Sequence, residues 1–114
     1  MEFKNLAKAR RTERSFDAGI DISDADINSI LRLASYSPSA FNLQHWRFVV
    51  TRDESVRSDL FEYCYFQKQI IECSAVITVC GNLSAHLEAQ LIYEDQPSKV
   101  KDKFIPMINT IYSS

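Results

Sequence analysis

Residues 37–50 read SPSAFNLQHWRFVV, and this stretch decides the fold because it joins the end of a helix to the start of a strand. The residue before Pro38 is pushed out of helical geometry, so a preceding helix has to end there. Phe48–Thr51 is a short, largely β-branched run and predicts a strand. Between them, Asn42 and Gln44 carry both donors and acceptors, which suits the mixed edge of a heteroaromatic ring. The stretch fits either a ligand-binding loop or an ordinary helix-to-strand loop that buries its tryptophan.

Upstream of this loop, the clearest helix begins after Ser23. Ser23 can cap the free amides at the helix start, and Asp26 follows at the position of a capping box. The apolar face of this helix consists of Ile27, Ile30, Leu31 and Ala34. A shorter helix is predicted over residues 3–11, where apolar side chains recur at helical spacing without Gly or Pro.

Downstream of the loop, the pattern alternates between helix and strand. Asp53 can cap one helix, and a second helical stretch covers about residues 67–73. Ala75–Cys80 is apolar except for Thr78, so it predicts a central strand that is covered on both faces and that Gly81 ends.

The last third of the chain is predicted to be helical. Ser84 is expected to cap one helix, and Pro97 suits the first turn of a final helix that breaks or kinks at Pro106. Helices combined with two strands indicate an α+β fold, but two strands alone make a marginal sheet. The final apolar stripe also runs almost to Ser114. We therefore expect this chain to need more polypeptide, from a C-terminal part, a partner subunit or both.

Composition limits the classes of function. The 114 residues are 46% hydrophobic and 25% charged, which is ordinary for one globular domain or part of one. A net charge of −2 argues against a nucleic-acid partner, and no apolar run approaches the roughly 20 residues that span a bilayer. Three cysteines without zinc or redox spacing predict free thiols in a reducing compartment. His86 has no ligand partner at a suitable spacing, so no metal site is expected. The expectation is a soluble cytoplasmic protein.

A second segment with chemical potential lies near the start, where residues 9–16 read ARRTERSF. Arginine presents a planar fork of donors that suits phosphate and carbonyl oxygens, and Thr12 and Ser15 add hydroxyl groups. This segment fits either a site for a cofactor phosphate or a solvated basic helix end that offsets the helix dipole.

Taken together, the two segments resemble the nitroreductase family. That family carries an R-R-S/T-x-R-x-F element near its start and, further on, a P-S-x-x-N-x-Q-P-W loop that enters the first main strand. The matching residues here are Arg10, Arg11, Thr12, Arg14 and Phe16, followed by Pro38, Ser39, Asn42, Gln44 and Trp46. The order and the spacing of both elements agree with the family.

The resemblance implies an α+β fold with a central, mainly antiparallel sheet flanked by helices, in a homodimer. It also implies that residues 1–114 form a single, partial nitroreductase-like domain that corresponds to the N-terminal half of the family fold. FMN would bind at the dimer interface. One subunit would contact the flavin phosphate, ribityl chain and pyrimidine edge through Arg10, Arg11, Thr12 and Arg14. The other subunit would line the ring and its tail with Pro38, Ser39, Ala40, Asn42 and Gln44.

The activity that the resemblance implies is transfer of electron pairs from NAD(P)H to nitroaromatics, quinones or similar electron-poor small molecules. The chemistry belongs to the flavin, so no catalytic side chain is named. A positive group beside the pyrimidine carbonyl, from Arg10 or Arg14, would stabilise the anionic reduced flavin. No nucleic acid, membrane or metal takes part in this reading.

Two positions depart from the family pattern. His45 stands where the family often has proline after the loop glutamine, which changes loop rigidity more than chemistry. Gln67 can replace a flavin-contacting asparagine only if the register slips by one residue. The alternative interpretation of the chain is a truncated or non-catalytic fragment that dimerises and binds flavin or another ligand without turnover.

Overall fold

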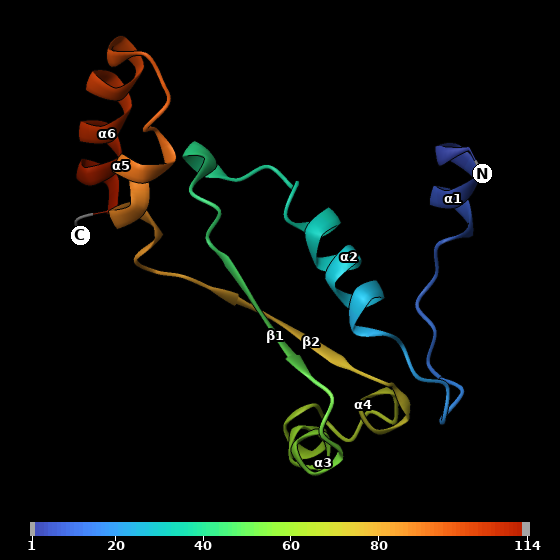
Figure 1. The fold of residues 1–114 in the computed structure, drawn as a ribbon. Coiled ribbons are helices and arrows are strands. Elements are labelled where there is room, and N and C mark those ends of the chain that lie inside the picture. Colours follow the sequence, from blue (N-terminus) through green and yellow to red (C-terminus); the bar gives the residue numbers. More distant parts are fainter. Residues whose placement is uncertain (1, 113–114) are drawn as a thin grey trace. The chain divides into compact units, whose positions relative to one another are not determined.

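A computed structural model describes residues 2–112 of the chain and shows an α+β fold (Figure 1). The elements in chain order are α1 (Phe3–Ala9), α2 (Asp24–Ala34), η1 (Ala40–Asn42), β1 (Trp46–Thr51), α3 (Glu54–Tyr63), α4 (Gln69–Glu72), β2 (Val76–Gly81), η2 (Ala85–Glu88), α5 (Ala89–Ile92) and α6 (Ser98–Tyr112), where η marks a 3₁₀-helix. The helices predicted over residues 3–11, after Ser23 and after Asp53 are therefore confirmed.

Two of the predicted helix caps form as expected. The Ser23 hydroxyl accepts a bond from the Asp26 amide at 3.1 Å and donates to the Asp26 carboxylate at 2.6 Å. Asp53 accepts from the amides of Ser55 and Val56, at 2.9 and 3.1 Å. Each bond satisfies an amide that has no partner within its helix, and this fixes where α2 and α3 begin.

The C-terminal third differs from expectation at the Ser84 cap and in having no break at Pro106, while a kink there stays a prediction. The Ser84 side chain makes no cap bond, because the residue lacks the extended backbone that an N-cap requires and a 3₁₀ turn starts after it. Helix α6 runs through Pro106 without a break. Losing one amide donor at a proline costs about 3 kcal/mol. Ile105 and Ile108, which lie on either side of Pro106 in sequence, are both buried, and their burial offsets that cost.

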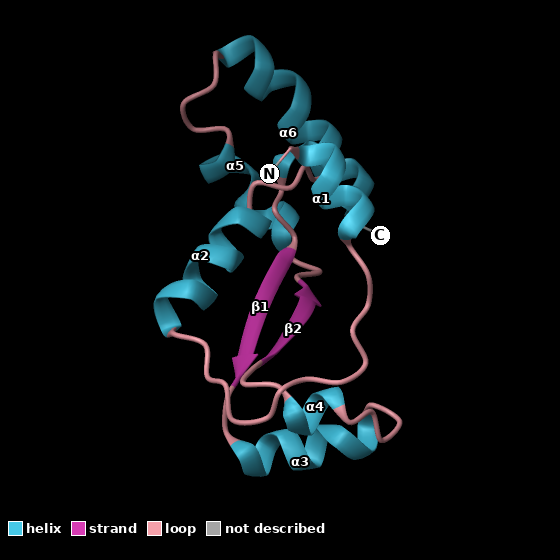
Figure 2. Cartoon of the chain, turned by 90° about the vertical axis from the view of Figure 1, so that its right-hand side faces the viewer, coloured by secondary structure: helices cyan, strands magenta, loops and turns pink. Residues whose placement is uncertain are grey.

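The two strands are hydrogen-bonded neighbours in one sheet, and their arrows point in opposite directions in Figure 2. The first strand starts at Trp46, slightly earlier than predicted. The prediction that the second strand is covered on both faces is wrong for this chain, because Val79 is 67% exposed. A continuous apolar run records hydrophobicity, but it does not show which element covers the strand.

The described residues divide into two compact units, and each is described by itself. The first unit comprises the residues up to Ile22 together with Val50–Val76. Within it, α3 and α4 pack side by side (Figure 2). The rings of Phe61 and Phe66 meet edge to face with centroids 5.3 Å apart. The N-terminal segment that carries the arginines belongs to this unit.

The second unit comprises Ser23–Val49 and the described residues from Ile77 onward. Its core consists of the fully buried side chains of Leu43, Ala85, Ala89 and Ile108. Partly buried side chains surround this core: Phe41, Ile92, Tyr93, Phe104 and Tyr112. The loop predicted to bind a ligand therefore contributes one of its own residues to the centre of the unit. That residues 1–114 form a single domain remains a prediction.

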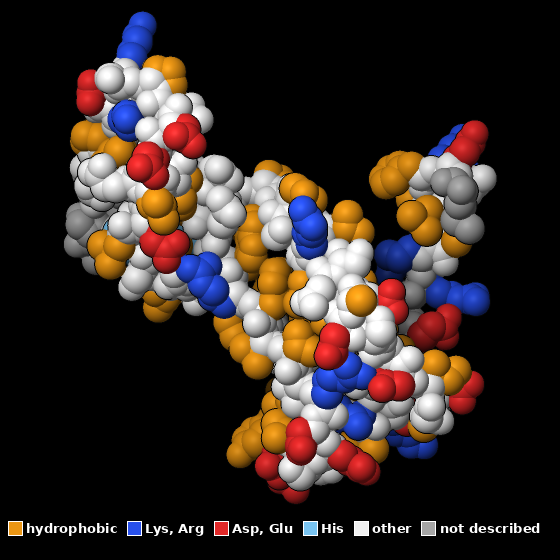
Figure 3. Space-filling model, in the orientation of Figure 1, with side chains coloured by type: hydrophobic (Ala, Val, Ile, Leu, Met, Phe, Trp, Pro, Cys, Tyr) orange, Lys and Arg blue, Asp and Glu red, His pale blue; other side chains and the backbone are white. Residues whose placement is uncertain are grey.

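Many apolar side chains remain exposed in this chain. Leu83 is 92% exposed, and Leu87 and Leu91 are 71% and 69% exposed. Figure 3 shows hydrophobic side chains at the visible surface among charged ones. The buried core is correspondingly small. No described helix is long and apolar enough to cross a bilayer.

Candidate functional site

A hollow of about 460 Å³ in the first unit is lined by three of the predicted site residues, Thr12, Arg14 and Gln67. Lys68 and Gln69, at the start of α4, complete its lining. The lining therefore offers a hydroxyl, a guanidinium, an ammonium and two amides. Such a set is rich in donors for carbonyl or phosphate oxygens, and the amides also accept bonds from ring N–H groups.

The turn before Gln67 has an uncommon backbone. Tyr65 and Phe66 have φ angles of 56° and 57°, in the left-handed region that non-glycine residues seldom adopt. The Phe66 amide donates to the carbonyl of Phe61 at 2.9 Å, so the turn wraps back onto the end of α3. Backbone of this kind persists only where the surrounding contacts impose it, and it gathers at functional sites. The turn places Gln67 at the edge of the hollow.

The N-terminal arginines have different surroundings. Arg10 caps the C-terminus of α1, where its amide donates to the carbonyl of Leu6 at 3.1 Å. The Arg11 guanidinium pairs with Glu13 at 2.8 Å, and both side chains are exposed. Arg14 lines the hollow. Of the three arginines, the structure thus brings one to the hollow, and the flavin role of all three stays a prediction.

Contacts among its own residues stabilise the loop over residues 38–44. Phe41, Asn42 and Gln44 have φ angles of 52°, 53° and 50°. The Gln44 amide donates to the hydroxyl of Ser39 at 3.0 Å, and Leu43 is fully buried between these polar residues. With Leu43 buried, the side chains of Asn42 and Gln44 stay exposed at the surface. Pro38 and Ala40 are exposed as well.

Two residues that the sequence reasoning missed support this loop from outside. The Tyr93 hydroxyl donates to the carbonyl of Phe41 at 2.9 Å. Arg47 donates to the carbonyl of Gln44 at 3.1 Å and pairs with Glu88 at 3.2 Å. Neither side chain belongs to a recognised motif, because Tyr93 reaches Phe41 and Arg47 reaches Glu88 from far along the chain. Only their proximity in space reveals them.

His45 and His86 both contact the ring of Tyr112. The His86 ring stacks on it with centroids 5.6 Å apart, and the His45 ring lies 5.8 Å away at a tilt. The His45 carbonyl also accepts a bond from the Asn82 amide. Across residues 2–112 there is no group of three or more His, Cys, Asp or Glu side chains placed to hold a metal ion.

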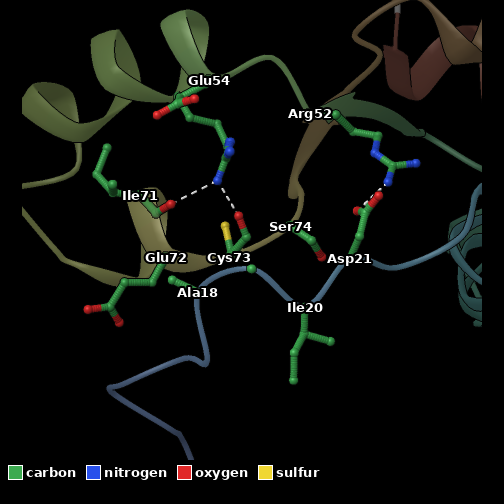
Figure 4. Close-up of a pocket in the computed structure, with 11 residues that line it drawn as sticks. Ala18, Ile20, Asp21, Arg52, Glu54, Ile71, Glu72, Cys73 and Ser74 are labelled. Atoms are coloured by element: carbon green, nitrogen blue, oxygen red, sulfur yellow. Dashed lines mark hydrogen bonds and ion pairs between the residues drawn. The ribbon is translucent and has the colours of Figure 1, made fainter.

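A second hollow of about 410 Å³ in the first unit was not predicted (Figure 4). Arg52 pairs with Asp21 at 2.5 Å on one side of it. On the other side, Arg57 donates to the carbonyls of Ile71 and Cys73, which Figure 4 draws as dashed lines. Both guanidinium groups are thus bonded to other groups of the protein.

Comparison with known proteins gives the same family as the motifs. The family model described as "Nitroreductase family" matches residues 7–101. YodC of Bacillus subtilis, a proposed NAD(P)H nitroreductase, is 34% identical over 116 aligned positions, which cover 96% of this chain and 57% of YodC.

Solved structures agree with the sequence comparison. A proposed nitroreductase of Exiguobacterium sibiricum, crystallised in complex with FMN, superposes with a TM-score of 0.85 at 31% identity. The match covers 100% of this chain and 58% of that one. The proposed nitroreductase ydfN of Bacillus subtilis gives a TM-score of 0.88 at 30% identity, over 97% of this chain and 56% of that one. The chain thus spans about half the length of the relatives it matches. With its arginine element and its Ser/Asn/Gln loop on a nitroreductase fold, the chain belongs to the nitroreductase family.

Proposed function

We propose that this protein is an FMN-dependent oxidoreductase that passes electron pairs from NAD(P)H to nitroaromatics, quinones or similar electron-poor small molecules. The observation that carries the proposal is the hollow lined by Thr12, Arg14 and Gln67. The pyrimidine edge of a flavin presents carbonyl oxygens and a ring N–H. A guanidinium, a hydroxyl and a side-chain amide match these groups in type. The donor set therefore fits the cofactor.

Each residue of the proposed site has a binding or orienting part. When bound, FMN would supply hydride acceptance and donation. Arg14 would supply positive charge to the pyrimidine edge, which would favour the anionic reduced form. Thr12 and Gln67 would orient the ring by hydrogen bonds. Arg10 and Arg11, on the same segment, would serve the phosphate.

The proposal includes a homodimer in which the loop over residues 38–44 of one subunit faces the arginine segment of the other. Support comes from the exposure of Asn42 and Gln44 on either side of a buried Leu43, which leaves both amide side chains at the surface of the loop. The FMN complex of the Exiguobacterium sibiricum relative supports the choice of cofactor. The cytoplasmic location remains a prediction from composition.

The absorption spectrum of the purified full-length protein tests this proposal. We expect the absorption bands of an oxidised flavin, retained through gel filtration at the mass of a dimer. We also expect NAD(P)H oxidation when a quinone or nitroaromatic is added. Colourless protein that takes up no added FMN would refute the proposal.

A second candidate follows from the coverage of the relatives, since the chain spans 57% of YodC. The 114-residue chain by itself would then dimerise and bind flavin or another ligand without turnover. An assay of NAD(P)H oxidation by this chain alone separates the two candidates. Sustained turnover by the 114-residue chain would eliminate the second.

A further inference from the structure

The Glu72 carboxylate joins two parts of the proposed site that lie far apart in the sequence. Glu72 is the last residue of α4, and its Oε2 accepts a hydrogen bond of 3.0 Å from the backbone amide of Phe16. Glu72 also lines the second hollow, where Figure 4 shows its carboxylate pointing away from Arg52 and Asp21. The Glu72 side chain is half-buried, and its bond to the Phe16 amide lies at the surface of the unit.

Phe16 lies just after Thr12 and Arg14 in the chain, so its amide is at the C-terminal end of the segment that carries them. That segment lies outside helix and strand, so no backbone ladder fixes its course. The lining of the first hollow shows that its residues lie beside the start of α4. The bond to Glu72 attaches the same segment to the end of α4. The segment therefore meets α4 at both ends of that short helix.

Helix α4 is itself anchored. Arg57 of α3 donates to the carbonyl of Ile71 at 2.9 Å and to that of Cys73. These carbonyls lie at the C-terminal end of α4, where carbonyl groups lack helical partners and a cation is favourable. A chain of contacts thus runs from α3 through Arg57 to α4, and from Glu72 to the backbone that carries Arg14.

We propose that Glu72 is a positioning residue for the flavin pocket, which holds Thr12 and Arg14 against the Gln67 edge without contacting the cofactor. This inference rests on the proposed function. A segment without secondary structure loses conformational freedom when it binds a ligand, and that loss weakens binding unless the segment is already ordered. The Glu72–Phe16 bond orders this segment before FMN binds.

Two variants and a control test this inference in the full-length protein. Glu72→Ala removes the acceptor, whereas Glu72→Gln keeps an acceptor oxygen at similar size but without charge. Glu62→Ala, which changes an exposed glutamate on α3, is the matched control. The readouts are the Kd for FMN, measured by quenching of flavin fluorescence, and amide hydrogen exchange at Phe16 without FMN.

We expect Glu72→Ala to raise the Kd roughly tenfold, as for the loss of one charge-assisted bond. Exchange at the Phe16 amide should speed up by a similar factor. Glu72→Gln should fall between Glu72→Ala and the wild type in both readouts, and Glu62→Ala should match the wild type. If Glu72→Ala does not fold, the Gln variant still decides the question through the same two measurements.

A double-mutant cycle separates positioning from general destabilisation. If Glu72 acts by holding the Arg14 segment, Arg14→Ala should cost less affinity in the Glu72→Ala background than in the wild type. Additive effects would overturn the inference, as would wild-type affinity in Glu72→Ala or unchanged exchange at Phe16. A wild-type protein that binds no FMN would instead refute the proposed function itself, so the two failures are distinguishable.

Discussion

Arg14 is the residue on which the proposed chemistry depends most. Its guanidinium is always charged and presents several donors in one plane, whereas lysine offers a single point charge. Arg14 shares its hollow with Lys68, so the site would place two cations near a reduced flavin. Arg11 differs, because its charge is already paired with Glu13.

We predict that Arg14→Ala raises the Kd for FMN by about tenfold to a hundredfold, the range expected for one or two charge-assisted bonds. The midpoint potential of the bound flavin should fall, because the anionic reduced form loses its neighbouring charge. Arg14→Lys should keep most of the potential but not the affinity. Fluorescence titration and spectroelectrochemistry measure the two quantities.

Arg32→Ala is the control for this prediction, since Arg32 is an exposed arginine in the last turn of α2. Equal losses in the Arg14 and Arg32 variants would mean that net charge, and not the hollow, governs binding. Wild-type affinity in Arg14→Ala would remove Arg14 from the proposed site.

The sequence reached some site residues and missed others for a physical reason. Thr12 and Arg14 follow from a family motif that fixes their spacing, whereas Gln67 follows only if the register slips by one residue. Tyr93 and Glu72 were missed because each acts through one bond to a distant backbone group, at Phe41 and Phe16. Such a bond leaves no periodicity and no local signature in a single sequence.

At the scale of elements, local sequence signals predicted where helices begin. Features that depend on tertiary contacts were not predicted. The starts of α2 and α3 followed from Ser23 and Asp53, because a cap is an interaction within one turn. The course of α6 through Pro106 did not, because the burial of Ile108 against distant residues offsets a local cost. The exposure of β2 depends on which elements lie over it, and that information is not in the strand itself.

The cap of α3 predicts a dependence of stability on pH. The Ser55 hydroxyl bond, followed by the Val56 amide bond, holds the pKa of the Asp53 carboxyl below its ordinary value of 3.8. A depressed folded pKa stabilises the fold above pH 3.8, and this contribution disappears as the pH falls through the lower folded value.

Asp53→Ala should therefore be less stable than the wild type at pH 6, and the difference should shrink below pH 3.8. Urea unfolding followed by circular dichroism at both pH values measures it. The exposed Asp59→Ala, on the same helix, is the control. A difference between Asp53→Ala and the wild type that does not change with pH would contradict the ionised cap.

At the scale of the whole chain, the small core makes each of its members important. Ile108 is fully buried, and it packs with Leu43, Ala85 and Ala89. The loop over residues 38–44 depends on this cluster, because Leu43 is its only fully buried residue. Stability of the second unit and the shape of the proposed binding loop are therefore linked.

We predict that Ile108→Ala lowers the free energy of unfolding by about 2–5 kcal/mol, the usual cost of such a truncation in a packed core. Ile111→Ala on the same helix should cost less than about 1 kcal/mol, since its side chain is 51% exposed. Chemical denaturation of both variants checks the contrast. Similar costs for the two would show that α6 is not packed as described.

The left-handed backbone at Phe41, Asn42 and Gln44 has a consequence for how this gene can vary. Single-base changes in a phenylalanine codon include isoleucine and valine, whose branched side chains fit poorly at positive φ. A single-base change in an asparagine codon leads to aspartate, which tolerates that backbone but brings a negative charge. Isoleucine or valine at position 41 would therefore strain the loop backbone, whereas aspartate at position 42 would keep that backbone and add a negative charge.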